Sequence, residues 1–188
     1  MIAGLDQLRG AHYGAILADP PWSFATWSDA GKGRAAERHY DCLTTEALFD
    51  LDVGRLAKRD AALFLWVTDP FLPIGLGLMR AWGFEYRTVA FTWAKRARCG
   101  DGWTMGNGYW TRANPEMCLL GIRGTPRRRR KDVCQLIVAE VREHSRKPDV
   151  VRERIERLVP GPYVELFARA RCQGWDAWGD QVDRFEAV

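Results

Sequence analysis

The chain has 188 residues, of which 47% are hydrophobic and 28% are charged, and its formal net charge is +4. This length suits a single domain over residues 1–188, because two separate cores would each be small. No apolar run approaches the roughly 20 residues of a membrane-spanning helix, and the N-terminus lacks the basic start and apolar core of a secretory signal. We therefore expect neither a membrane protein nor a secreted one, and predict a cytoplasmic location.

Cysteine and histidine form no ligand pattern in this sequence. The five cysteines are never spaced as C-x-x-C, and the three histidines are scattered, without an H-E-x-x-H arrangement. Such spacing favours neither a disulfide framework nor a zinc cluster. We predict reduced cysteines and no metal.

Short apolar runs alternate with amphipathic stretches along the chain, which is typical of an α/β sheet with helices on both faces. The expected strands are residues 13–18, 61–67, 86–94, 116–122, 133–138 and 163–168. The expected helices are residues 45–58, 70–82 and a third that opens at Pro148 and stops at Pro160-Gly161. In this third helix Val151, Ile155 and Leu158 fall at helical spacing.

The first expected strand runs directly into Asp19-Pro20-Pro21-Trp22. Prolines carry no N–H group, so the Pro20 carbonyl is expected to stay free to accept a hydrogen bond beside the Asp19 carboxylate. Two such acceptors match the two N–H donors of a primary aromatic amine such as N6 of adenine, and the Trp22 ring would stack on the base. The alternative is that the motif only ends a strand in a turn, with Trp22 a core aromatic.

Residues 23–43 and 96–114 are rich in glycine or polar residues and resist assignment to helix or strand. Long loops in a compact domain are usually functional or disordered, so we expect both to form lids over the site. Several tryptophans sit beside polar or basic residues, as expected where bases stack, although most tryptophans are expected to fill the core or pocket walls. These tryptophans are Trp27, Trp93, Trp103 and Trp110.

Positive charge is concentrated in the run Arg127-Arg128-Arg129-Arg130-Lys131, with Arg123 just before it. A run of this kind favours contact with phosphates and predicts a steep loss of nucleic-acid binding with salt. The alternative is a solvated loop.

The Asp19–Trp22 motif is followed in fixed order by four further segments: Leu63–Thr68, Trp110–Gly121, His144–Asp149 and Glu165–Arg169. This ordered set, over roughly residues 13–182, resembles the adenine-N6 methyltransferase family that includes the catalytic subunit of the mRNA adenosine methyltransferase. The resemblance implies a Rossmann-like fold with a mixed, mostly parallel sheet and helices on both faces. It also implies S-adenosylmethionine as methyl donor and transfer to adenine N6 in DNA or RNA.

The resemblance assigns roles residue by residue. Asp19 and the Pro20 carbonyl would hold the target amine, Pro21 would shape the turn and Trp22 would stack on the base. Lys147 would meet the carboxylate of the donor, which agrees with a positive charge just before a helix N-terminus; the alternative is an exposed loop lysine. The full set implied to bind the donor is Ile2, Asp19, Ser145, Lys147, Phe167, Arg169, Asp180 and Gln181.

The sequence departs from the family at three places. Asp180 stands where the family often has asparagine; the alternative for Asp180 and Gln181 is a surface position. The segment 170–174 lacks a histidine and an asparagine of the eukaryotic enzyme, which leaves Arg171 as a substitute. The loop after Trp22 is longer and adds basic residues. The residues expected to contact nucleic acid are Lys32, Arg34, Arg38, Tyr40, Arg127, Arg128, Arg129, Arg130 and Lys131.

DNA is the preferred substrate, because a compact member without extra RNA-binding regions looks prokaryotic or phage-like. Three alternatives stay open: an RNA adenosine N6-methyltransferase, a non-catalytic nucleic-acid-binding partner subunit, and an enzyme that methylates a protein or small-molecule amine. The intact motif, Lys147 and Arg169 favour an enzyme over a partner subunit. A homodimer is compatible with the sequence, and no membrane partner is expected.

Overall fold

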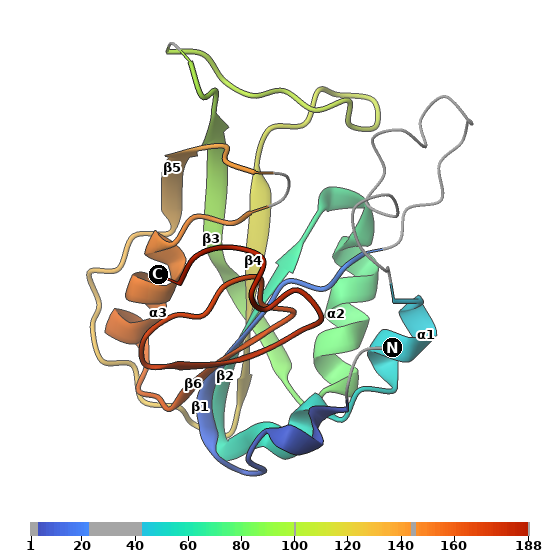
Figure 1. Ribbon diagram of the computed structural model, residues 1–188, viewed down its shortest axis with the longest axis vertical. Helices are drawn as coiled ribbons and strands as arrows, with labels where there is room; N and C mark the ends of the chain where they lie inside the picture. Colours follow the sequence, from blue (N-terminus) through green and yellow to red (C-terminus); the bar gives the residue numbers. More distant parts are fainter. Residues whose placement is uncertain (1–3, 23–42, 100, 144–145, 188) are drawn as a thin grey trace.

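The computed structural model describes residues 4–22, 43–99, 101–143 and 146–187 (Figure 1). These residues form a seven-stranded sheet in the order β5-β3-β4-β2-β1-β6-β7. The strands are β1 (Tyr13–Ala18), β2 (Ala57–Val67), β3 (Glu85–Arg96), β4 (Glu116–Arg123), β5 (Leu136–Glu140), β6 (Tyr163–Leu166) and β7 (Trp175–Trp178). Strand β4 is antiparallel to both of its neighbours, and the other neighbouring pairs in this sheet are parallel. The predicted mixed, mostly parallel sheet is confirmed.

Helices cover both faces of the sheet, as expected (Figure 1). They are α1 (Thr45–Phe49), α2 (Leu72–Ala81) and α3 (Val150–Leu158). Buried residues of α1 and α2 belong to one hydrophobic cluster, and Val151 and Ile155 of α3 belong to the cluster on the opposite face. Strand β1 is buried along its whole length because it lies between two parallel neighbours and under helices on both sides.

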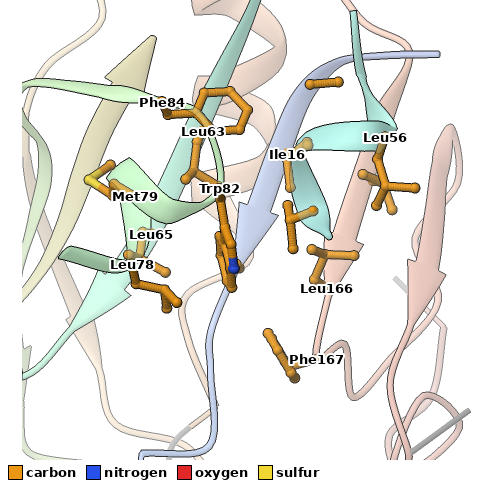
Figure 2. Close-up of a cluster of buried hydrophobic side chains, with 14 of the residues drawn as sticks. Ile16, Leu56, Leu63, Leu65, Leu78, Met79, Trp82, Phe84, Leu166 and Phe167 are labelled. Carbon is orange, nitrogen blue, oxygen red and sulfur yellow. The ribbon is translucent and has the colours of Figure 1, made fainter. Parts of the chain in front are cut away.

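Figure 2 shows the cluster on the face of α2. Ile16 of β1 and Leu63 and Leu65 of β2 belong to this cluster. They lie close to Met79 of α2 and to Trp82, which directly follows α2. The indole N–H of Trp82 donates to the carbonyl of Leu48 at 3.0 Å, which ties α1 to the end of α2. This dense packing holds the end of β1, and hence Asp19, on a rigid base.

Several elements differ from the sequence prediction, most of them by one to three residues at an end. The predicted helix 45–58 ends at Phe49, because the Asp52 carboxylate accepts from the Arg55 N–H at 3.2 Å and starts a short 3-10 turn. Strand β2 therefore begins at Ala57, ahead of its predicted start at residue 61. Strand β5 begins at Leu136, later than predicted, and β7 was not predicted. A four-residue strand such as β7 is too short to show a hydrophobic period.

The strand directions place two sets of strand ends at opposite edges of the sheet. Strands β1, β2 and β6 point the same way, so the residues after them, Asp19, Thr68 and Phe167, lie at one edge, here called the carboxyl edge. The reversed strand β4 begins at this edge with Glu116 and ends at the opposite, amino edge with Arg123. Ligands of open α/β sheets bind at the carboxyl edge, so the site is sought there.

Within the described residues, no helix has the length and apolar character needed to cross a membrane. The cytoplasmic location stays a prediction.

Candidate active site

Asp19, directly after β1, forms an ion pair with Lys147, just before α3. The Lys147 ammonium lies 2.8 Å and 2.7 Å from the two carboxylate oxygens of Asp19. Both side chains are nearly buried, with 13% of Lys147 and 15% of Asp19 exposed. The Arg169 guanidinium lies 3.8 Å from the same carboxylate. Residues from three distant parts of the sequence thus meet at the carboxyl edge.

The ion pair continues into a row of alternating charges. The Lys147 ammonium lies 3.3 Å from one carboxylate oxygen of Glu116, and the other oxygen lies 2.6 Å from the Lys95 ammonium. We call Asp19, Lys147, Glu116 and Lys95 the charge row. Buried charges are costly unless they are paired, and each member of the row has a neighbour of opposite sign.

The charge row favours the ionised forms of Lys147 and Glu116. Burial lowers the pKa of Lys147, but the attraction of Asp19 and Glu116 outweighs it and raises this pKa above its ordinary value of 10.5. Burial raises the pKa of Glu116, but Lys147 and Lys95 outweigh it and bring this pKa below 4.5. Fixed charges in a site with little water are poised to stabilise charge that develops in a reaction.

A small cavity, the Asp19 cavity, lies beside the ion pair and has a volume of about 40 Å³. Its walls include Asp19, Trp66, Lys147, Phe167, Arg169 and Phe185. Phe185 comes from the C-terminal segment: its N–H donates to the Arg169 carbonyl at 3.0 Å, and the Arg146 guanidinium lies 4.7 Å from its ring. The volume holds only a few water molecules, so the walls must move apart before a ligand of nucleoside size fits.

A larger cavity of about 660 Å³, the Glu116 cavity, lies on the other side of the charge row. Its walls include Thr68, Asp69, Lys95, Tyr109, Thr111 and Glu116. Its volume falls within the roughly 300–1,000 Å³ typical of small-molecule sites. Since Glu116 also contacts Lys147, which lines the Asp19 cavity, the charge row joins the two cavities.

Two buried polar atoms in the cavity-lining residues lack hydrogen-bond partners among the described residues. They are Nε1 of Trp66, a residue of the Asp19 cavity, and Oγ1 of Thr68, a residue of the Glu116 cavity. Buried polar groups without partners are rare in native proteins. Both atoms are consistent with walls that are completed by a bound molecule.

The turn after Asp19 differs from the sequence expectation. The Pro20 carbonyl does not stay free: it accepts the Trp22 N–H at 2.8 Å, because the chain closes a tight turn there. It retains one further lone pair. Trp22 is only 6% exposed, its ring stacks on Phe71 at 5.1 Å, and its indole N–H donates to the Trp66 carbonyl at 3.2 Å. Trp22 therefore belongs to the hydrophobic core, in contrast to the expectation that its ring stacks on a base. From there it fixes the turn that carries Asp19.

At the end of β6, Phe167 adopts a φ of 60°, which bulky residues rarely do. Its ring packs edge-on against Trp178 at 5.3 Å, and the turn brings Arg169 to the Asp19 cavity. Asp180 and Gln181 are not among the residues that line either cavity: Asp180 is exposed, and the Gln181 side chain accepts from Arg184 at 2.7 Å. Phe185, which was not predicted, lines the Asp19 cavity instead.

Several predicted site residues lie outside the described part of the chain. They are Ile2, Ser145, Lys32, Arg34, Arg38 and Tyr40. The expected lid at residues 23–43 lies almost wholly outside it as well. The second expected lid, residues 96–114, does connect β3 to β4 and contributes Tyr109 and Thr111 to the Glu116 cavity.

The basic run Arg127–Lys131 lies at the amino edge, away from Asp19 (Figure 1). Arg129 donates to the carbonyls of Leu158 and Glu156 at the end of α3. Arg130 forms two hydrogen bonds of 2.9 Å to Asp132 and lowers the pKa of that carboxyl to about 2. The six residues that separate the ends of the β2–β4 pairing correspond to about 20 Å. The run lines neither cavity, since β4 carries the chain away from the carboxyl edge. Its contact with phosphates stays a prediction, and we expect none beside Asp19.

Sequence reasoning missed Glu116 and Lys95 of the charge row and a second buried pair, in which Arg152 lies 2.7 Å from Glu165. Burial raises the pKa of Glu165 in spite of the neighbouring Arg152. A signal was available, because Glu116 begins one largely apolar strand and Glu165 lies within another, and buried charged residues require partners. The identity of those partners depends on the fold.

Among the described residues, no three side chains of His, Cys, Asp or Glu form a group that could hold a metal ion. The absence of a metal from the reaction stays a prediction.

A mixed sheet with helices on both faces and a paired carboxylate at its carboxyl edge defines the class: an α/β S-adenosylmethionine-dependent methyltransferase fold. The MT-A70 family model matches residues 13–181, and the chain belongs to this family. The resemblance identified from the sequence is thereby confirmed.

Relatives come from bacteria and eukaryotes. The chain is 33% identical to the Type II methyltransferase M.MunI of Mycoplasma sp. over 94% of its own length and 80% of the relative. It is 34% identical to the N(6)-adenosine-methyltransferase catalytic subunit METTL3 of Homo sapiens, and 33% identical to the N(6)-adenosine-methyltransferase MT-A70-like of Arabidopsis thaliana. Each match covers 91% of the chain but only 28% and 24% of the two eukaryotic proteins, respectively.

Proposed function

We propose that this chain transfers a methyl group from S-adenosylmethionine to N6 of adenine in nucleic acid, with DNA as the preferred polymer. The observation that carries the proposal is the Asp19 carboxylate, which lines one cavity at the carboxyl edge and is linked through Lys147 to Glu116 of the second cavity. The relatives include N(6)-adenosine-methyltransferases, which supports the same reaction.

The residues of the Asp19 cavity fit the donor chemically. The donor carries a carboxylate and an ammonium group, and Lys147 and Arg169 supply positive charge while Asp19 supplies negative charge. The donor also carries ribose hydroxyls and an adenine, which are able to satisfy an indole N–H such as that of Trp66. When bound, S-adenosylmethionine supplies an electrophilic methyl group, and the chain's part is to align the acceptor with it.

We propose that the target adenine enters through the Glu116 cavity. Its amino group is a poor nucleophile, because the nitrogen lone pair is delocalised into the purine. Asp19 and the remaining lone pair of the Pro20 carbonyl would accept the two amine hydrogens and favour the reactive, pyramidal form. Asp19 would then stabilise the positive charge that develops on N6.

The target base must leave a duplex, or be unpaired from the start, to reach this site. The Asp19 side chain is only 15% exposed, and a base held in a duplex would not reach it. We propose that loop contacts set a short or loose sequence preference.

An RNA substrate is the second candidate function, and two of the relatives named above are adenosine methyltransferases. The match to the Type II methyltransferase supports the preference for DNA. We do not propose for this chain the binding partners of the larger eukaryotic enzymes.

The deciding experiment is mass spectrometry of nucleosides from DNA and RNA incubated with the purified protein and the donor. We expect N6-methyladenine in DNA, and Asp19→Ala is expected to remove it while the chain keeps its fold. The matched control is Asp132→Ala, which deletes a carboxylate at the amino edge and leaves activity unchanged. If neither polymer is methylated but calorimetry shows that the donor binds, the acceptor would be a protein or a small molecule. If the donor does not bind, the chain would be a non-catalytic partner subunit.

A further inference from the structure

We propose that residues 101–115, here called the aromatic arm, bind unpaired nucleotides on either side of the target base. The inference rests on the proposed function and names the surface that would hold its substrate. The arm connects β3 to β4 at the carboxyl edge and extends away from the sheet (Figure 1).

Exposed aromatic side chains are concentrated in the arm. Of the eight large hydrophobic residues that are exposed in the described part of the chain, four lie here: Trp103, Met105, Tyr109 and Trp110. Trp110 is 107% exposed, and its φ of 65° is one that bulky residues rarely adopt. An exposed ring on a strained backbone adds nothing to the core, so its position calls for an explanation outside folding.

Hydrogen bonds hold the arm in a defined conformation. The Asn114 side chain accepts the Lys95 N–H at 3.1 Å and donates to the Lys95 carbonyl at 2.9 Å and to the Thr104 carbonyl. Arg112 donates to the Gly106 carbonyl at 3.0 Å. These bonds hold the two halves of the arm together, so its aromatic rings are presented with little further loss of conformational entropy on binding.

Positive charge accompanies the rings. Lys95, Arg96, Arg98 and Arg112 lie in or next to the arm, against two acidic residues, Asp101 and Glu116. The Arg96 guanidinium lies 5.8 Å from the Trp103 ring. Arg98 donates to the Val141 carbonyl at 3.0 Å, and the next residue, Arg142, contacts the carbonyl of Lys147 at 2.8 Å. Cationic side chains therefore lead from the arm to the charge row.

The arm also forms a wall of the proposed entrance for the target base. Tyr109 and Thr111 line the Glu116 cavity together with Lys95 and Glu116. A nucleotide strand whose adenine enters this cavity would place its neighbouring nucleotides against the exposed rings. Stacking on aromatic side chains beside cationic groups is how proteins hold single strands without reading their sequence.

Cationic residues flank the rings, which favours nucleic acid over a protein partner. The core of a protein interface is depleted of charged residues, whereas here Lys95, Arg96 and Arg98 precede the aromatic residues of the arm and Arg112 follows them.

The test is the affinity of the full chain for a short adenine-containing DNA single strand, its RNA counterpart and a matched DNA duplex, measured by fluorescence anisotropy without donor. We expect Tyr109→Ala combined with Trp110→Ala to raise the single-strand Kd by at least about fivefold, the lower end for one lost base stack. The control is Tyr86→Ala, which removes a 42% exposed ring at the far end of β3 and should leave the Kd unchanged. The DNA and RNA strands show which polymer the arm prefers.

Two results would overturn the proposal. One is an unchanged Kd in the double variant with its thermal unfolding intact. The other is a change from dimer to monomer in sedimentation velocity without loss of affinity, which would make the arm a protein interface. Because binding is measured without donor, arm-dependent binding in the absence of methyl transfer would refute the proposed function alone. Methyl transfer with arm-independent binding would refute this inference alone.

Discussion

The two edges of the sheet carry positive charge in contrasting ways. At the amino edge, Arg127–Lys131 are consecutive in sequence and exposed, and Arg130 pairs with the nearby Asp132. At the carboxyl edge, Lys95 and Lys147 come from distant segments and are nearly buried between carboxylates. The first group is conspicuous in the sequence and the second is not. Burial with opposite charges, not local charge density, marks the site.

The largest expected effect is that of Lys147→Ala. It leaves Asp19 and Glu116 buried without their shared cation, which costs about 3–5 kcal/mol of stability for a broken buried pair. Donor affinity is expected to fall by at least about a hundredfold, because a charge-assisted contact to the donor carboxylate is lost as well. Chemical denaturation and calorimetry measure the two effects. Lys131→Ala is the matched control at the amino edge, and an equal effect there would abolish the contrast between the edges.

Glu116→Gln tests the middle of the charge row with a smaller change. The amide keeps the shape and one acceptor but removes the negative charge between Lys95 and Lys147. We expect a loss of about 2 kcal/mol at neutral pH, typical of a hydrogen bond to a charged group. Unfolding in urea measures it. An unchanged free energy of unfolding in the variant would show that the carboxylate contributes no net stability.

The stability difference between the wild type and the Glu116→Gln variant is expected to depend on pH. Because the folded pKa of Glu116 lies below 4.5, its ionised form stabilises the fold above that value, and the contribution is lost as the pH falls through the folded pKa. The stability difference between the wild type and Glu116→Gln should therefore narrow below pH 4.5. The pKa of Lys147 is raised above 10.5, so its charged form stabilises the fold below pH 10.5. This stabilisation is lost as the pH rises through the folded pKa. A difference that is constant from pH 3 to 7 would contradict the assignment.

The smallest expected effect is that of replacing all five residues of Arg127–Lys131 by glutamine. Methyl transfer and the dependence of nucleic-acid binding on salt should both change by less than about twofold, because β4 carries the chain about 20 Å along the sheet from the carboxyl edge before the run begins. Filter binding over a series of salt concentrations checks this. A markedly shallower salt dependence would restore the run to the interface.

Much of the fold could be predicted from the sequence, because strands such as β1 are continuous apolar runs between polar turns. The prediction failed where local signals were weak: β7 is short, and Asp52 caps a turn inside what looked like one helix. For the site, the ordered motifs pointed to Asp19, Lys147, Phe167 and Arg169, and these four do line one cavity. Glu116 was missed because its importance comes from Lys95 and Lys147, which only the sheet brings to it.

The reversal of β4 has a consequence for how related chains can diverge. Since β3 ends and β4 begins at the same edge, the connection between them starts and finishes beside the Glu116 cavity without crossing the sheet. Lengthening such a connection costs little, about 0.6 kcal/mol for each doubling of its length. Insertions or exchanges there would alter which target is held while leaving the methyl-transfer machinery intact, so this hairpin is the natural place to engineer new recognition.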